Sequence, residues 1–186
     1  MAKLGRLITA MVTPFNAKGE VDYKQAQKLA KALISSGSDG LVITGTTGER
    51  HTVTDEEQLK LFATVREAIG RRGTMVAGTG GNCTRESIAM TEKAEQLGMD
   101  AALLIVPYYN KPTQEGMYQH FKAIADSTSL PCILYNVPAR TVTNLAPETV
   151  IRLSEIKNIV GVKEASGNLE QIGKIIHGAK KGCLVC

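Results

Sequence analysis

Short apolar runs recur along the whole chain and limit its fold more than any other feature. They occupy residues 7–13, 40–44, 74–79, 101–106, 132–136, 159–166 and 183–186. Runs that are apolar at almost every position are typical of parallel strands covered on both faces. Their spacing, about 30 residues, suits βαβ units. The pattern therefore predicts an α/β protein with a parallel sheet.

The segments between these runs have the periodicity and the end signals of amphipathic helices. Thr54 and Glu57 form a Thr-x-x-Glu capping box, and Gly70 is suited to end that helix. Another helix is expected over 84–97, and Pro147 is expected in the first turn of a later one. The apolar faces of the first, fourth and sixth helices are expected to comprise Ala26, Leu29, Ala30 and Leu33; Met117, Phe121, Ile124 and Ala125; and Leu169, Ile172, Ile175, Ile176 and Ala179.

Two architectures use such units, the open doubly wound sheet and the closed barrel. No G-x-G-x-x-G opens the first helix, and residues capable of chemistry follow several different strands, which favours a TIM (β/α)8 barrel. The chain carries six β/α units plus the start of strand seven. Because a barrel needs eight units and roughly 250 residues, residues 1–186 are expected to be a single catalytic barrel domain, truncated at the C-terminus.

Composition and charge argue against nucleic-acid and membrane partners. Aromatic residues make up 4% of the chain without any Trp, and the net charge of +4 is spread without a basic block. No apolar run approaches the roughly 20 residues that span a bilayer. The run from Leu7 to Val12 precedes Pro14 and predicts a strand rather than a signal peptide.

The cysteines lie at 83, 132, 183 and 186. A single C-x-x-C without a second pair or a histidine partner is weak evidence for zinc or redox chemistry. Buried, reduced thiols are the favoured interpretation, which suits the cytoplasm. The sequence predicts no metal and no cofactor.

Lys163 is the lysine that most suggests chemistry, because it lies in the apolar strand IVGVKEAS. Other lysines, such as Lys60 and Lys122, fall within helices and are expected to be solvated. Burial in an apolar barrel favours the neutral amine, which is the nucleophilic form. The alternative is a strand-end lysine paired with its neighbour Glu164.

Three loops that follow other strands add further candidates. In Gly45-Thr46-Thr47-Gly48-Glu49, two hydroxyls lie in a tight loop whose backbone N–H groups can face an anion, although a turn plus helix cap is the simpler alternative. At the end of the fifth strand Tyr135 can relay protons, and Arg140 in the loop beyond can bind a carboxylate. A packed tyrosine and an exposed arginine are the alternative. The adjacent Tyr108 and Tyr109 suit an interface anchor or a second relay.

Together, GTTGE, PYYN, YNVPAR and VKEAS resemble the dihydrodipicolinate synthase family within the N-acetylneuraminate lyase superfamily. The resemblance runs from LITAMVTPF to the end of the chain, in order and at the family's spacing. It implies a class I aldolase-like lyase that condenses pyruvate with aspartate semialdehyde in the diaminopimelate route to lysine. It also implies a homotetramer when the protein is full length.

The resemblance assigns a role to each candidate. Lys163 would form the Schiff base with pyruvate. Tyr135 and Thr46 would relay protons, with Tyr109 as the third relay member, reaching into a neighbouring subunit's site. Thr47 would hold the pyruvate carboxylate, and Arg140 would bind the carboxylate of the semialdehyde.

The resemblance also implies a possible lysine-effector site at a subunit interface, which Asn82, Glu86 and Tyr108 fit. Asp55 and Gln58 stand where inhibited bacterial members often carry histidines. Whether lysine inhibits this chain is therefore left open.

Two alternatives remain at this point. A lyase for N-acetylneuraminate or a keto-deoxy sugar acid would share the lysine, the tyrosine and a similar loop, but Arg140 favours the synthase. A non-catalytic barrel fragment or regulatory remnant would explain the truncation, whereas Lys163, Tyr135 and both threonines argue for an enzyme.

Overall fold

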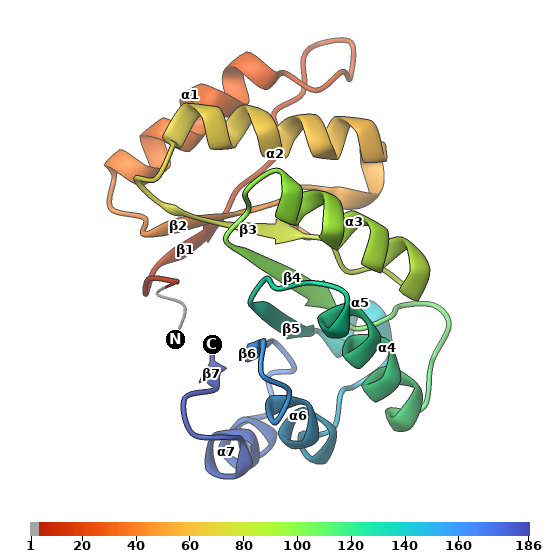
Figure 1. Ribbon diagram of the computed structural model, residues 1–186. Helices are drawn as coiled ribbons and strands as arrows, with labels where there is room; N and C mark the ends of the chain where they lie inside the picture. The colour runs from red at the N-terminus through yellow and green to blue at the C-terminus, as the bar shows by residue number, and fades with distance from the viewer. Residues whose placement is uncertain (1–3) are drawn as a thin grey trace. The chain divides into compact units, whose positions relative to one another are not determined.

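The computed structural model describes residues 4–186 as two compact units. The first unit comprises residues 4–78 and 93–101, and the second comprises residues 79–92 and 102–186. Within each unit the strands run parallel, and each strand pairs with the next one along the chain (Figure 1). This arrangement confirms the predicted α/β class.

In the first unit three strands alternate with helices. The elements are β1 (Ile8–Ala10), α1 (Tyr23–Ser35), β2 (Gly40–Ile43), the 3-10 helix η1 (Arg50–Thr52), α2 (Asp55–Ile69) and β3 (Thr74–Gly78). Gly40 is opposite both Ile8 and Thr74 in the sheet. Helices α1 and α2 lie side by side (Figure 1).

Helix α2 begins and ends where its sequence predicts. The Thr54 hydroxyl accepts a hydrogen bond from the Glu57 N–H at 3.2 Å, and the Glu57 carboxylate accepts one from the Thr54 N–H at 2.8 Å. Gly70 ends the helix with φ 56°, a conformation that favours glycine. The fully buried side chains of Leu61 and Phe62 fix the face that packs inward.

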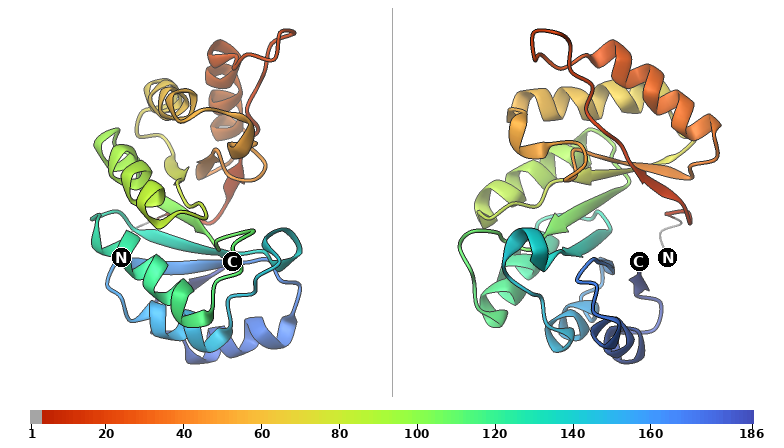
Figure 2. Two further views of the ribbon diagram at one scale, coloured as in Figure 1. Left: turned by 90° about the vertical axis from the view of Figure 1, so that its right-hand side faces the viewer. Right: turned by 180° about the vertical axis from the view of Figure 1, so that it is seen from behind.

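The second unit continues the same pattern. Its elements are α3 (Thr84–Gln96, whose last turn belongs to the first unit), β4 (Ala101–Ile105), α4 (Gln114–Asp126), β5 (Cys132–Asn136), α5 (Pro138–Thr141), α6 (Pro147–Ser154), β6 (Ile159–Glu164), α7 (Leu169–Gly178) and β7 (Leu184–Val185). Helices α4, α6 and α7 lie in a row in the same unit (Figure 2). Its core packs Met117, Phe121 and Ile124 of α4 against Leu104 and Leu134.

The first strand and helix α7 differ from the sequence-based expectations. The first strand, Ile8–Ala10, is shorter than 7–13, and beyond it the chain turns back so that Phe15 pairs with Val21. The expected apolar face of α7 is half exposed. Leu169 is 82% and Ile176 63% exposed, whereas the polar Gln171 is buried.

The expectation of buried thiols holds for Cys132 and is wrong for the other three cysteines, because Cys83 and Cys183 are half-buried and Cys186 is exposed. Within residues 4–186, no helix is both long and apolar enough to cross a membrane. That residues 1–186 form one domain stays a prediction.

Candidate active site

Strands β5 and β6 bring Tyr135 and Lys163 together. The two residues are direct partners in the parallel register, so their side chains leave the sheet on the same face. The Lys163 ammonium lies 4.4 Å from the centroid of the Tyr135 ring. Tyr135 is buried and Lys163 is half-buried. An amine and a phenol are thus adjacent at the carboxyl ends of neighbouring strands.

Glu164 does not pair with Lys163, so that alternative is wrong. Successive side chains of a strand point to opposite faces, and Glu164 therefore faces away from its neighbour. Its carboxylate accepts hydrogen bonds from Asn136, Gln171 and the Ser166 N–H instead. Among the ion pairs of residues 4–186, none joins Lys163 to Glu164.

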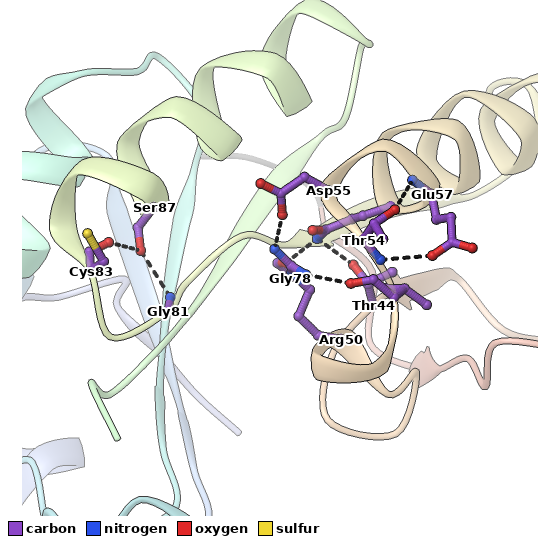
Figure 3. A network of polar contacts seen from close by, with 11 residues as sticks. Thr44, Arg50, Thr54, Asp55, Glu57, Gly78, Gly81, Cys83 and Ser87 are labelled. Atoms are coloured by element: carbon purple, nitrogen blue, oxygen red, sulfur yellow. Dashed lines mark hydrogen bonds and ion pairs between the residues drawn. The ribbon is translucent and has the colours of Figure 1, made fainter. Parts of the chain in front are cut away.

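The loop after β2 is supported from behind by buried polar contacts. Thr44 has φ 53°, which is unusual for a β-branched residue. The fully buried Gln58 amide donates to the Thr44 hydroxyl and to the Gly78 carbonyl, both at 2.7 Å. A Cβ on Gly78 would lie 2.3 Å from the Thr44 carbonyl oxygen, so this contact needs glycine. Figure 3 shows Thr44 and Gly78 beside the capping box of α2.

Thr46 and Thr47 are exposed at the tip of this loop. Gly48 is buried behind them, and its carbonyl accepts a hydrogen bond from the Thr13 hydroxyl at 2.6 Å. A Cβ on Gly48 would meet the Met11 carbonyl oxygen at 3.0 Å. The glycine therefore allows a close approach that turns both threonines outward.

Tyr109 is displayed on a constrained loop after β4. It is 89% exposed, and both it (φ 69°) and Lys111 (φ 48°) have left-handed backbones. The Asn110 side chain donates to the Asn82 carbonyl at 2.8 Å. This bond ties the loop to the chain just before α3.

Arg140 lies in the short helix α5 rather than in a loop. Pro138 is suited to the first helical turn, and the helix ends at Val142 with φ 60°. The Arg140 side chain is exposed, and within residues 4–186 it joins no ion pair. Its guanidinium is thus available to an anionic ligand.

The three residues of the possible lysine-effector site lie on neighbouring segments of the second unit. Glu86 is exposed in the first turn of α3, and Asn82 precedes that helix. The Tyr108 hydroxyl lies 4.0 Å from where a Cβ on Gly81 would be. In this segment the Gly81 N–H donates to the Ser87 hydroxyl, which donates to the Cys83 carbonyl (Figure 3).

Asp55 and Gln58 differ in burial. Asp55 forms an ion pair with Arg50, whereas Gln58 is buried behind the GTTGE loop. In this chain Gln58 therefore has a supporting role that the sequence did not indicate.

Of the predicted residues, the structure brings together Lys163 with Tyr135, and the segment of Asn82 with the loop of Tyr108 and Tyr109. Arg140 lies on α5 in the second unit, and Thr46 and Thr47 belong to the first unit. Within the described chain, no group of three or more His, Cys, Asp or Glu side chains could hold a metal ion.

Sequence reasoning missed Gln58 and the partners of Glu164. The alternation of side chains along a strand predicts that Glu164 points away from Lys163. Its side-chain partners Asn136 and Gln171 have no such local signal.

Comparisons with known proteins agree with these motifs. The model of the dihydrodipicolinate synthetase family matches residues 3–186. A 4-hydroxy-tetrahydrodipicolinate synthase of Dehalococcoides mccartyi is 66% identical over 180 residues, which are 97% of this chain and 61% of that protein. The chain thus spans about three fifths of the length of this relative.

Solved structures agree as well. A crystal structure of the Cyanidioschyzon merolae enzyme with lysine bound has a TM-score of 0.97 and 46% identity, covering 100% of this chain and 63% of that one. A chloride-inhibited dihydrodipicolinate synthase from Acinetobacter baumannii, complexed with pyruvate, has a TM-score of 0.95 and 46% identity, covering 98% and 62%. These similarities confirm the predicted TIM-barrel fold class. The chain belongs to the dihydrodipicolinate synthetase family.

Proposed function

We propose that the protein to which this chain belongs is a 4-hydroxy-tetrahydrodipicolinate synthase, a lyase that condenses pyruvate with aspartate semialdehyde. The observation that carries the proposal is the Lys163 amine 4.4 Å from the centre of the Tyr135 ring, on adjacent strands. A nucleophilic amine beside a proton-transfer group is what imine formation with a keto acid requires.

The proposed chemistry begins at Lys163. The neutral amine attacks the ketone carbon of pyruvate, and the resulting carbinolamine loses water to give an imine. Tyr135 donates a proton to the carbinolamine hydroxyl, which leaves as water, and the tyrosine is protonated again in later steps. Loss of a proton from the methyl group then gives an enamine, whose carbon attacks the aldehyde.

The remaining residues bind the substrate carboxylates or transfer protons in this proposal. Thr47 holds the pyruvate carboxylate and Thr46 passes protons, a role supported by the exposure of both side chains on a constrained loop. Tyr109 completes the relay in a neighbouring subunit, which its 89% exposure supports. The free guanidinium of Arg140 binds the carboxylate of the semialdehyde.

Partners and location are also proposals. We expect a homotetramer, for which the exposed Tyr109 is the local support. None of the four cysteines forms a disulfide within residues 4–186, which suits the reducing cytoplasm. Lysine as an effector is supported by the bound lysine in the Cyanidioschyzon merolae structure, and Asn82, Glu86 and Tyr108 would line that site.

A sugar-acid lyase is the second candidate within the superfamily. The names of the relatives favour the synthase, and the exposed Arg140 on α5 fits a second carboxylate. A direct comparison of pyruvate plus aspartate semialdehyde with N-acetylneuraminate as substrates separates the two candidates.

The test of the mechanism is reductive trapping. The intact protein is incubated with pyruvate and borohydride, and the modified peptide is identified by mass spectrometry. We expect the reduced adduct on Lys163 and on no other lysine, and its loss in Lys163→Met but not in the matched control Lys122→Met on α4. An adduct elsewhere, or none in the folded wild-type protein, would overturn the proposal.

A further inference from the structure

A closed ring of four polar side chains, of which Asn144 is exposed and the other three are buried, lies next to the Tyr135–Lys163 pair. Its members are Asn136 at the end of β5, Glu164 at the end of β6, Asn144 before α6 and Gln171 in the first turn of α7. Asn136 is fully buried, and Glu164 and Gln171 are 8% and 7% exposed. Asn136 and Glu164 are direct register partners, one position beyond Tyr135 and Lys163.

Hydrogen-bond donors converge on the Glu164 carboxylate. One oxygen accepts from the Ser166 N–H at 2.8 Å, and the other from the Gln171 amide at 3.0 Å. The Asn136 amide donates to both oxygens, at 3.1 and 3.0 Å. Within residues 4–186 no Lys, Arg or His forms an ion pair with Glu164, so these hydrogen bonds alone compensate for its burial.

The direction of each hydrogen bond in the ring is fixed. The Leu145 N–H can only donate, and it donates to the Asn136 carbonyl oxygen at 3.0 Å, which turns the Asn136 amide group towards Glu164 and Asn144. The Asn144 carbonyl oxygen accepts from Asn136 and from Gln171, and its amide donates back to Gln171. The ring therefore needs an acceptor-only group at position 164, which a carboxylate provides.

We propose that Glu164 is a positioning residue for the Schiff-base lysine, an inference that rests on the proposed function. By joining β5, β6 and the start of α7 at the position after the reactive pair, the ring holds the Lys163 amine against the Tyr135 phenol. A displacement of about 1 Å at a reacting group can cost about 100-fold in rate, so a rigid support next to that group has a kinetic effect.

The substitution Glu164→Gln tests this role with almost no change of shape. It places an amide among groups that already donate, so the ring must break or rearrange. Glu170→Gln is the matched control, because Glu170 is an exposed carboxylate on α7 whose ion-pair partner within residues 4–186 is Lys174. The variant Glu164→Asp keeps an acceptor-only carboxylate at this position, on a side chain one methylene shorter, and serves as the rescue.

The readouts are the rate of borohydride trapping with pyruvate, and kcat and KM per active site, where active sites are counted by exhaustive trapping. We expect Glu164→Gln to lower the trapping rate and kcat per site by about 10- to 100-fold, with KM for pyruvate within about threefold. The control should match the wild type, and Glu164→Asp should keep a higher rate than Glu164→Gln.

A structural role alone would reduce the number of sites that can be trapped but leave kcat per site unchanged. That result, or a Glu164→Gln trapping rate equal to that of the wild type, overturns the positioning role. Absence of any Lys163 adduct in the wild type would instead overturn the proposed function.

Discussion

Replacing Gln58 with methionine is expected to destabilise the first unit and loosen the GTTGE loop. The substitution keeps the length of the side chain and removes two buried hydrogen bonds, to the Thr44 hydroxyl and the Gly78 carbonyl, each 2.7 Å long. At about 0.5–1.5 kcal/mol each, their loss lowers the free energy of unfolding by about 1–3 kcal/mol.

One feature of the site offsets part of this loss. The Gln58 carbonyl oxygen is buried and finds no partner among residues 4–186, so the methionine also removes an unsatisfied group. We therefore expect a net destabilisation of about 1–2 kcal/mol. Because the loop carries Thr46 and Thr47, KM for pyruvate should also rise.

The change in the free energy of unfolding is measured by urea unfolding, as a shift of the midpoint without a change of the m-value. Gln119→Met is the control. Gln119 is exposed on α4 and donates only to Glu115, so its replacement should stay within about 0.5 kcal/mol of the wild type. Equal unfolding midpoints for the two variants, or a Gln58→Met protein as stable as the wild type, would refute the argument from buried hydrogen bonds.

Two further predictions concern a proton relay and a buried histidine. Tyr135→Phe keeps the ring beside Lys163 and removes the phenol, so turnover should fall by roughly 10²–10⁴-fold in a coupled assay, and unchanged turnover would exclude Tyr135 as the relay. Burial lowers the pKa of His120 from 6.5 to about 4. As the pH falls, the unfolded chain therefore binds a proton at this histidine before the folded chain does. The free energy of unfolding should be highest above about pH 6.5 and should fall by at most about 3 kcal/mol as the pH approaches 4. Urea unfolding at several pH values should show this loss, and His120→Gln should reduce it; equal pH dependence in both proteins would contradict the assignment.

The parts of the fold that could be predicted from sequence are those whose signals are local. Helix α2 has its capping box at Thr54 and its terminating Gly70 within a few residues of its ends, and both act as predicted. The strands were found because burial on both faces requires a continuous apolar run. Helix α5 was missed because four residues are too few to show a period.

In the candidate site too, the residues with a local signal were predicted and those that depend on distant segments were not. Lys163 and Tyr135 could be identified because a lysine in an apolar strand and a tyrosine at a strand end are unusual. The left-handed backbones of Thr44 and Tyr109 depend on contacts made by distant segments. Gln171 is buried in place of Leu169 because it completes the ring around Glu164, and a hydrophobic pattern cannot predict such a partner.

The pairing of each strand with the next one along the chain has a consequence for synthesis of the protein. Within the first unit, β1 pairs with β2 and β2 pairs with β3, so each of these two pairings joins strands that are close in the sequence. A ribosome adds about 5–20 residues per second, and the roughly 30 residues from one strand to the next therefore emerge within a few seconds. Local collapse and helix formation take microseconds, far less than this interval. We expect the nascent chain to add one strand–helix pair at a time, with its newest strand exposed only until the next one arrives.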